Sequence, residues 1–441
     1  MKSRIFLVAS AILAWFLGTA SARDVVIVTS FPKELFETYK KTFEAKHPGT
    51  TVVINSKQTN AGVTYLRETK AKPEADIFWV SAPDAFQTLD SDGLLEKYAP
   101  PKEIMAKIPA KIGNFPIHDP DGKYFGFAIS GYGLMWNKNY LKAHKLPAPK
   151  EWPDLTHPRY YNHLIISAPS RSGTTHLTVE TILQAYGWDK GWALLLNAGG
   201  NMGSITERSF GVTEAVISGK YGIGVVIDFF GLSAIASGQP VEFAYPSLTS
   251  VVPASVGIIK GGPNPQEAKA FVNYLLSEAG QMVLFAPEIA RLPVIPELYA
   301  KAPKDYPNPF KKKLGGVEFN DELSSSRRDV VNSLYDHIIT FRHNELRDAW
   351  KSIYKAEEAL AKSKSAPITI TAQAKSMIGD ARKLAAQVAI NDKRASDKEI
   401  IGAFKSKSGL KAQLETEWEN FARGNYAKAK ELAEKAAAMA K

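Results

Sequence analysis

The chain is most informative in its middle, at Leu164-Ile-Ile-Ser-Ala-Pro-Ser-Arg-Ser-Gly-Thr-Thr-His-Leu-Thr178. The apolar residues 164–166 predict a buried strand, and the apolar spacing of residues 177–186 predicts a helix. Between them lie small, hydroxyl-bearing residues and Gly173, where the backbone can turn and approach another group closely. The sequence therefore predicts a strand, a tight turn and a helix around which the second half of the fold is organised.

This turn has the composition of an anion-binding site. The N-terminus of the following helix presents unpaired N–H groups and a partial positive charge. The turn itself supplies hydroxyl groups and one arginine: Ser170, Arg171, Ser172, Thr174 and Thr175. These features favour a bound anion, and the alternative is an ordinary Ser/Thr helix cap without a ligand. The stretch is not a nucleotide-binding P-loop, because no Gly-Lys-Ser/Thr follows at the required spacing.

Strands and helices alternate in the N-terminal part of the chain. Strands are predicted at residues 23–30, 51–54 and 75–80, with amphipathic helices at residues 31–46 and 62–70. This alternation is typical of a doubly wound α/β sheet, in which ligands bind at the carboxyl ends of the strands. Those ends carry Ser30, Phe31 and Ser81, which we therefore expect to face a ligand.

The order of segments predicts two lobes and a helical tail. Strand-like residues 124–129 and 132–137, separated by Ser130-Gly131, predict the first crossing between the lobes. The tail combines Ala, Glu and Lys with apolar residues at helical spacing, which suits a small helical bundle. The predicted divisions are residues 23–129 for lobe 1, 130–250 for lobe 2, 251–345 for the return to lobe 1 and further helices, and 346–441 for an all-helical extension.

Composition narrows the class of protein. The 441 residues are enough for two domains, and the chain has no cysteine, which excludes disulfides, thiolate metal sites and a lipoprotein anchor. Residues 1–22 resemble a signal peptide, with Lys2 and Arg4, an apolar segment, and Ala20-Ser21-Ala22 as the cleavage site. The net charge of +10 falls largely on the tail, where solvated helices are a simpler explanation than nucleic-acid binding. We expect a periplasmic protein without stable membrane insertion.

Several motifs together resemble the extracellular solute-binding proteins (family 1) of ABC importers. They are Val-Thr-Ser-Phe at residues 28–31, Ala-Asp-Ile-Phe-Trp-Val-Ser at 75–81, Gly-Leu-Met-Trp-Asn at 133–137 and Ser-Arg-Ser-Gly-Thr at 170–174. The resemblance covers roughly residues 24–355 and is strongest to the branch of ferric-iron-, phosphonate- and phosphate-ester-binding proteins. It implies a two-lobed clamp of the type II periplasmic fold that closes on its ligand by a hinge. It also implies a membrane permease as partner.

The resemblance divides the predicted site into two halves. In iron-binding members, Ser-Gly and a small residue hold a phosphate or carbonate anion, and Ser172-Gly173-Thr174 match that stretch. Iron is held there by a Tyr-Tyr pair, usually with a His near the first strand, but this chain has Phe229-Phe230 and Phe31 at those places. Phenylalanine offers no oxygen to ferric iron, which needs hard oxygen ligands. The chain thus keeps the anion half of the site, and we predict no metal ligands.

Two further charged residues are candidates for binding the ligand, and each also has a purely structural or surface interpretation. Asp228 follows a buried strand and is either a structural carboxylate or a partner for an ammonium or hydroxyl group of the ligand. Arg208 is either a ligand-facing loop residue or a surface residue paired with Glu207. His176, in the predicted helix, is more typical of a structural histidine.

The predicted function is the capture of a small organic phosphonate or phosphate, without a cofactor. The preferred compound is 2-aminoethylphosphonate, because an anion site next to a carboxylate matches its two charges. The alternatives are a sugar phosphate, ferric iron with an altered ligand set, and an exported phosphatase-like enzyme. The enzyme is disfavoured because neither Gly-x-Ser-x-Gly nor His-Glu-x-x-His occurs. The predicted ligand-binding residues are Ser30, Phe31, Ser81, Ser170, Arg171, Ser172, Gly173, Thr174, Thr175, Arg208 and Asp228.

Overall fold

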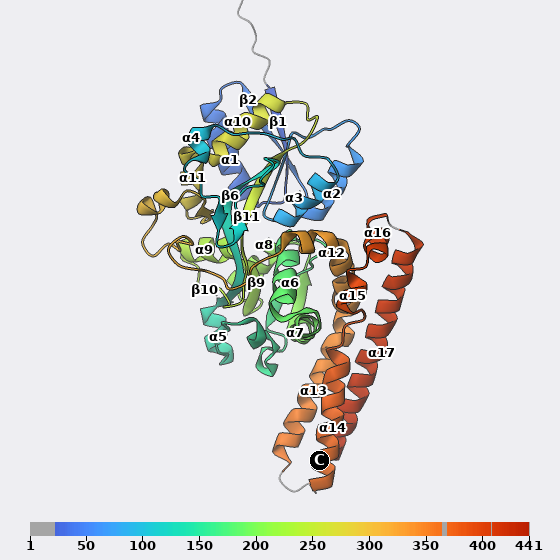
Figure 1. Ribbon diagram of the computed structural model, residues 1–441. Coiled ribbons are helices and arrows are strands. Elements are labelled where there is room, and N and C mark those ends of the chain that lie inside the picture. Colours follow the sequence, from blue (N-terminus) through green and yellow to red (C-terminus); the bar gives the residue numbers. More distant parts are fainter. Residues whose placement is uncertain (1–22, 364–367, 407, 441) are drawn as a thin grey trace, which may run out of the picture.

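The computed structural model describes residues 23–363, 368–406 and 408–440. These residues form two α/β lobes and a long helical arm that extends away from the second lobe (Figure 1). The predicted fold class, a two-lobed α/β clamp with a helical C-terminal extension, is confirmed. The predicted signal peptide, residues 1–22, lies outside the described residues. None of the helices described here is long and apolar enough to cross a membrane.

Lobe 1 is built on parallel strands rich in β-branched residues. β1 (Arg23–Thr29) pairs with β2 (Thr50–Ser56) on one side and with β3 (Ile77–Val80) on the other. The helices that follow these strands are α1 (Lys33–Lys46), α2 (Thr59–Glu68) and α3 (Pro83–Ser91). α1 buries Leu35, Tyr39 and Phe43, which share one face of the helix at the predicted spacing. The predicted strands and helices of this part are confirmed, with ends that differ by a few residues.

Two long strands connect the lobes. β6 (Tyr124–Asn137) pairs with β11 (Val251–Ile258) up to Gly131, and from Tyr132 onward it pairs with β9 (Ile223–Ile227). The two predicted strand segments are therefore one continuous strand, because Ser130 and Gly131 stay extended while the partner strand changes. A side chain at position 131 would not fit, since a Cβ there would lie 2.9 Å from the ring of Tyr245.

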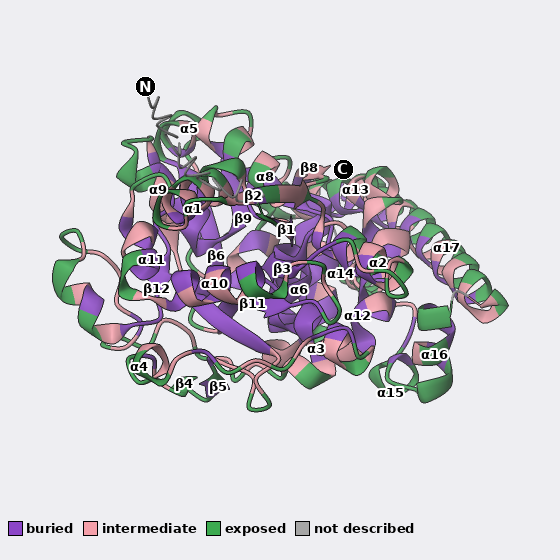
Figure 2. Cartoon of the chain, turned by 90° about the horizontal axis from the view of Figure 1, so that it is seen from above, coloured by how far each residue is buried: buried purple, intermediate pink, exposed green. Residues whose placement is uncertain are grey.

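Lobe 2 continues the same sheet. The order of the main path is β2-β1-β3-β11-β6-β9-β7-β8. β7 (Leu164–Ser167) runs parallel to β8 (Met202–Thr206) and β9, so their carboxyl ends lie at one edge. Helices begin just after these ends: α6 (Gly173–Tyr186), α8 (Ser209–Ile217) and α9 (Asp228–Ala236). The order of strand, turn and helix predicted for residues 164–186 is confirmed. Figure 2 shows buried residues concentrated along the strands beneath the covering helices.

The remaining elements complete the two lobes. Those of lobe 1 and its return are α4 (Lys102–Met105), β4 (Lys111–Ile112), β5 (Phe115–Pro116), α10 (Pro265–Leu276), α11 (Glu278–Met282) and β12 (Leu292–Pro293). Those of lobe 2 are α5 (Lys138–His144), α7 (Trp188–Asn201) and β10 (Val241–Ala244). Short 3-10 turns span Trp152–Thr156, Pro158–Tyr160, Val283–Phe285 and Pro296–Lys301.

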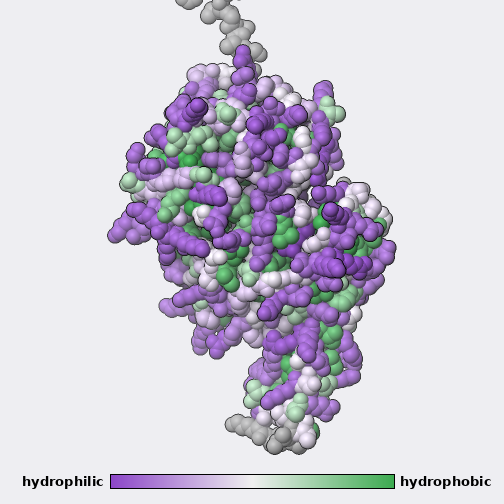
Figure 3. All heavy atoms as spheres, viewed as in Figure 1, coloured by the Kyte–Doolittle hydropathy of each residue, from purple (hydrophilic) through white to green (hydrophobic). Residues whose placement is uncertain are grey.

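The C-terminal part of the chain is helical from Asp321 onward, which includes the last part of the predicted segment 251–345. Its elements are α12 (Asp321–Tyr335), a π-helical turn (Asp336–Thr340), α13 (His343–Lys362), α14 (Ile368–Ala385), α15 (Asp392–Ala395), α16 (Lys398–Ser406) and α17 (Gly409–Met439). The arm is held to lobe 2 by close packing, because a Cβ at Gly200 in α7 would lie 2.1 Å from Trp350 in α13. The visible face of the molecule carries mainly hydrophilic residues, including much of the arm (Figure 3).

Candidate ligand-binding site

A narrow cavity lies between the lobes, at the carboxyl ends of the strands. Lobe 1 contributes residues that follow β1, β2 and β3, and lobe 2 contributes residues that follow β7, β8 and β9. The lobes are in contact here, and a Cβ at Gly173 of lobe 2 would lie only 2.9 Å from both Ala82 Cβ and Thr59 Oγ1 of lobe 1. Asn60 of lobe 1 also donates a hydrogen bond of 2.7 Å from Nδ2 to the carbonyl oxygen of Ser170. The structure thus has its lobes closed around this space, which we call the anion cavity.

Most of the predicted site residues meet at the anion cavity. Eight of the eleven line it: Ser30, Phe31, Ser81, Arg171, Ser172, Gly173, Thr174 and Arg208. The structure brings these residues together from both lobes, although they are spread over nearly 180 residues of sequence. Their contact with a ligand stays a prediction.

The start of α6 is arranged as the sequence indicates. Ser172 is the extended N-cap residue, and its hydroxyl accepts a hydrogen bond of 3.2 Å from the N–H of Thr175. The N–H groups of Gly173 and Thr174 precede the internal hydrogen bonds of the helix, so they can bind an external acceptor. The capped helix and the anion site are therefore compatible, because the cap uses a different N–H group.

Thr175 and Ser170, both predicted to bind the anion, instead form hydrogen bonds with other residues of the chain. The hydroxyl of Thr175 is hydrogen-bonded to that of Ser167, and Thr175 is buried. Ser170 contributes its carbonyl oxygen to the contact with Asn60. Neither residue lines the anion cavity, and their contact with a ligand stays a prediction.

The electrostatics of the anion cavity favour negative charge. The N-termini of α2, α6 and α8 all open into it, and each carries a partial positive charge. Arg171 and Arg208 lie on its wall, and among the described residues that line it none is acidic. Glu207 pairs with Arg171 at 2.6 Å, and not with Arg208 as the alternative interpretation expected. Arg208 instead lies over the ring of Phe210, 5.2 Å from its centroid, and partial burial lowers its pKa.

Asp228 lies behind the cavity wall. Its carboxylate accepts hydrogen bonds from the N–H of Gly131 at 2.8 Å, the hydroxyl of Tyr245 at 2.9 Å and the N–H of Phe229 at 2.8 Å. It is 1% exposed, and burial raises its pKa to about 7 against the effect of these donors. Of the two interpretations left open by the sequence, these contacts favour the structural one. The prediction that Asp228 binds an ammonium group of the ligand loses its geometric support.

Aromatic side chains form one wall of the anion cavity. Phe229 and Phe230 pack with ring centroids 4.4 Å apart, and both line the anion cavity together with Phe31. In the part of the chain that the structure describes, no group of three or more His, Asp or Glu side chains could hold a metal ion.

The residue that the sequence did not reveal is Arg291. It precedes β12, and its guanidinium Cζ lies 3.4 Å from the ring centroid of Phe229 and 4.4 Å from that of Phe31. No motif marks this position, although a single arginine within Ile289-Ala-Arg-Leu-Pro-Val-Ile295 is unusual in an otherwise apolar run. That signal could have identified it as a buried charge.

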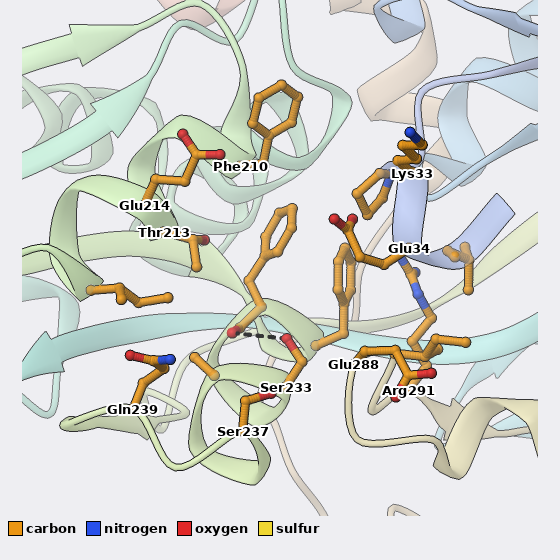
Figure 4. A pocket seen from close by; sticks show the side chains of 17 residues that line it. Lys33, Glu34, Phe210, Thr213, Glu214, Ser233, Ser237, Gln239, Glu288 and Arg291 are labelled. Atoms are coloured by element: carbon orange, nitrogen blue, oxygen red, sulfur yellow. Dashed lines mark hydrogen bonds between the residues drawn. The ribbon is translucent and has the colours of Figure 1, made fainter. Parts of the chain in front are cut away.

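A second cavity adjoins the first, and we call it the side cavity. The two share Pro32, Phe210, Phe229 and Phe230. Figure 4 shows Lys33, Glu34, Glu288 and Arg291 on one wall of the side cavity, with Phe210, Thr213, Glu214 and Gln239 facing them. The first group belongs to lobe 1 and the second to lobe 2, so this space also lies between the lobes.

A buried ionic network joins the lobes and α12. Asp84 in lobe 1 pairs through Oδ2 with Arg328 of α12 and lies 3.0 Å from His176 Nε2 of lobe 2. Burial alone would raise the pKa of Asp84, but Arg328 and His176 hold it well below its usual range. His176 is fully buried, and its Nδ1 lies 2.8 Å from Asn332 Oδ1. These contacts support the structural interpretation of His176.

Comparison with known proteins places the chain among binding proteins. Residues 72–318, more than half of the chain, match the family of bacterial extracellular solute-binding proteins. The phosphoglycerate transport regulatory protein PgtC of Salmonella typhimurium is 29% identical over 401 residues, covering 91% of this chain and 94% of that protein. A putative 2-aminoethylphosphonate-binding periplasmic protein of the same species is 22% identical over 252 residues, which cover 55% of this chain and 70% of that protein.

Solved structures show the same fold. The periplasmic binding protein AfuA of Actinobacillus pleuropneumoniae, with fructose-6-phosphate bound, has a TM-score of 0.64 and 21% identity, covering 73% of this chain and 99% of that one. Iron-bound HitA of Pseudomonas aeruginosa has a TM-score of 0.59 and 19% identity, covering 70% of this chain and 98% of that one. At these identities the likeness establishes the two-lobed fold and leaves the ligand open.

Proposed function

Since this chain belongs to the family of bacterial extracellular solute-binding proteins, we propose that it captures a small organic phosphate or phosphonate between its lobes. Such a protein delivers its solute to the membrane permease of an ABC importer, and it is not an enzyme. The observation that carries the proposal is the anion cavity, where three helix N-termini and two arginines meet without an acidic side chain among the described lining residues. Export through the predicted signal peptide remains part of the proposal.

The start of α6 would hold the phosphoryl or phosphonyl group. The N–H groups of Gly173 and Thr174 and the hydroxyl of Thr174 can donate to its oxygens. Ser30 and Ser81 of lobe 1 line the same cavity, so a bound anion would receive hydroxyl donors from both lobes. An anion held in this way favours the closed arrangement, because only that arrangement offers it both sets of donors.

The names of three relatives support this class of ligand. They refer to phosphoglycerate, 2-aminoethylphosphonate and fructose-6-phosphate, which share a phosphoryl or phosphonyl group. 2-Aminoethylphosphonate and sugar phosphates both remain within the proposed class. The burial of Asp228 removes the specific argument for an ammonium group. The lining residues do not favour ferric iron, because Phe229 and Phe230 offer it no oxygen ligands.

The proposal can be tested by the melting temperature of ligand-stripped protein with inorganic phosphate, 2-aminoethylphosphonate, hexose phosphates, glycerol phosphates and ferric citrate. A ligand at a hundred times its Kd adds roughly 2.7 kcal/mol to the folded state, which raises Tm by several degrees in a protein of this size. We expect a rise with at least one organic phosphate or phosphonate. A rise with ferric citrate alone would overturn the proposal, and so would no response to any phosphorus compound.

A further inference from the structure

Arg291 is a buried charge without hydrogen-bond partners. It is 1% exposed, and its Nε, Nη1 and Nη2 find no acceptor among the residues that the structure describes. The same part of the chain buries two more arginines, and both are bonded: Arg327 donates two hydrogen bonds of 2.9 Å to Glu180, and Arg328 binds Asp84 and Asn60. A buried guanidinium with unbound donors is costly, so its presence calls for an explanation.

Aromatic rings cover the guanidinium of Arg291, whose three nitrogens are buried without hydrogen-bond partners among the described residues. The rings of Phe229 and Phe31 lie 3.4 Å and 4.4 Å from its Cζ, so cation–π contacts hold the guanidinium. Such contacts use the faces of the guanidinium, whereas its N–H groups point outward in its plane. Phe229 lines both the anion cavity and the side cavity, and Arg291 lines the side cavity. The two cavities adjoin at Phe229, so a short molecule bound at α6 would reach Arg291 once the ring of Phe229 moves aside.

The acidic side chains nearby do not neutralise Arg291. Asp228 acts on it from a distance and opposes the effect of burial, which lowers the pKa of Arg291 to about 9. The guanidinium is therefore charged at neutral pH. Glu34, Glu214 and Glu288 line the side cavity but are exposed, so water and salt screen their charges.

We propose that Arg291 binds a carboxylate of the ligand, which makes the ligand a short phosphorylated or phosphonylated carboxylic acid. The inference rests on the proposed function and adds the chemistry of the second end of the ligand. A carboxylate fits because its two oxygens match the parallel N–H groups of a guanidinium edge. An ammonium group does not fit, because it would face a buried positive charge. The phosphoryl or phosphonyl group lies at α6 and the carboxylate at Arg291.

The experiment compares two ligands that differ only at this second end. 3-Phosphoglycerate and glycerol 3-phosphate share a three-carbon phosphate ester, and one carries a carboxylate where the other carries an alcohol. We expect isothermal titration calorimetry on the purified, ligand-stripped chain to give at least tenfold tighter binding of 3-phosphoglycerate. 3-Phosphonopropionate and 2-aminoethylphosphonate form a second pair, in which the carboxylate is again expected to bind more tightly than the ammonium.

Arg291→Met tests the residue itself. We expect this variant to bind the two members of each pair with similar affinity, while Arg291→Lys keeps part of the preference. Arg423→Met, which changes an exposed arginine of the arm, serves as the matched control and should keep the full preference. The inference is wrong if the wild-type chain binds both members equally, or if Arg291→Met retains the preference. If Arg291→Met fails to fold, the wild-type comparison still decides.

The outcomes separate this inference from the proposed function. Binding of glycerol 3-phosphate and 3-phosphoglycerate with equal affinity would overturn only the role of Arg291. Binding of no phosphate or phosphonate at all would overturn both.

Discussion

Arg328 and Arg291 are both buried between the two lobes, and their surroundings are opposite. Arg328, in α12, is 4% exposed, pairs with Asp84 and donates two hydrogen bonds to Asn60 at 3.0 and 2.7 Å. Arg291, beside β12, is 1% exposed. Its guanidinium contacts the rings of Phe31 and Phe229, whereas that of Arg328 contacts hydrogen-bond acceptors. The first arginine is satisfied by the chain, and the second, within the described residues, is not.

This difference separates a structural charge from one that awaits a ligand. Removing a satisfied buried charge leaves its partner unpaired, so the cost falls on folding. Removing an unsatisfied buried charge relieves the folded state, so the cost falls on binding. The effects on folding and on binding can therefore be measured separately for each arginine.

Arg328→Met should destabilise the protein strongly. Asp84 would stay buried with only His176 beside it as a charge partner, and breaking a buried ion pair by removing one partner costs about 3–5 kcal/mol. Arg291→Met should leave the free energy of unfolding unchanged or raise it. Urea unfolding of both variants without ligand measures the contrast, and equal losses in the two would remove the distinction between the arginines.

The carboxylates near the two arginines should act on stability in opposite pH ranges. The pKa of Asp84 is depressed, so its stabilisation is present above its unfolded pKa of about 4 and is lost as the pH falls. The pKa of Asp228 is raised to about 7, so its contribution is complete below about pH 4 and declines as the pH rises toward 7. Unfolding measured from pH 3 to 8 should show both trends.

The same measurement links Asp228 to Arg291. The positive charge of Arg291 lowers the pKa of Asp228. The loss of stability caused by ionisation of Asp228, which we call the upper decline, should therefore extend to higher pH in Arg291→Met. In Arg328→Met the upper decline should stay in place, because that arginine acts on Asp84. An upper decline that is unchanged in Arg291→Met would contradict the assignment of this pH range to Asp228.

Gly173→Ala should weaken binding without preventing folding. Its Cβ would lie 2.9 Å from Ala82 Cβ and Thr59 Oγ1 across the cleft, so the lobes could close only by shifting apart. We expect a loss of affinity of about tenfold, which equals about 1.4 kcal/mol. Gly379→Ala, in open space on α14, is the matched control and should bind normally. Unaltered affinity in Gly173→Ala would show that the closed arrangement is not the binding form.

Thr174→Val should have the smallest effect. It removes one hydroxyl at the start of α6 and keeps the shape of the side chain, so a ligand would lose one hydrogen bond of about 0.5–1.5 kcal/mol. Titration calorimetry with the phosphate compound that binds most tightly should show a higher Kd. The Tm of the ligand-free protein should be unchanged. A change in Tm alone, with unaltered affinity, would assign the hydroxyl of Thr174 to folding and contradict its contact with the ligand.

Much of the fold could be predicted because it depends on neighbouring residues. Local apolar periodicity predicted the alternating strands and helices of residues 23–91 and the helical tail, and the structure confirms both. The turn before α6 was predicted from its small, hydroxyl-bearing residues, and it is confirmed as well. The continuity of β6 could not be predicted in this way. Ser130-Gly131 resembles a break, and only the change of partner strand from β11 to β9 keeps it extended.

The candidate site also has features that the sequence determined and features that only the tertiary structure decided. The sequence by itself determined the hydroxyl-rich start of α6, the absence of tyrosines at residues 229 and 230, and the family that these features indicate. Only the tertiary structure decided that Asp228 is satisfied by the chain and that Arg291 lies between Phe31 and Phe229. The physical reason is that burial and hydrogen bonding of a charge depend on its neighbours in space, and Phe31 and Arg291 are 260 residues apart in the chain.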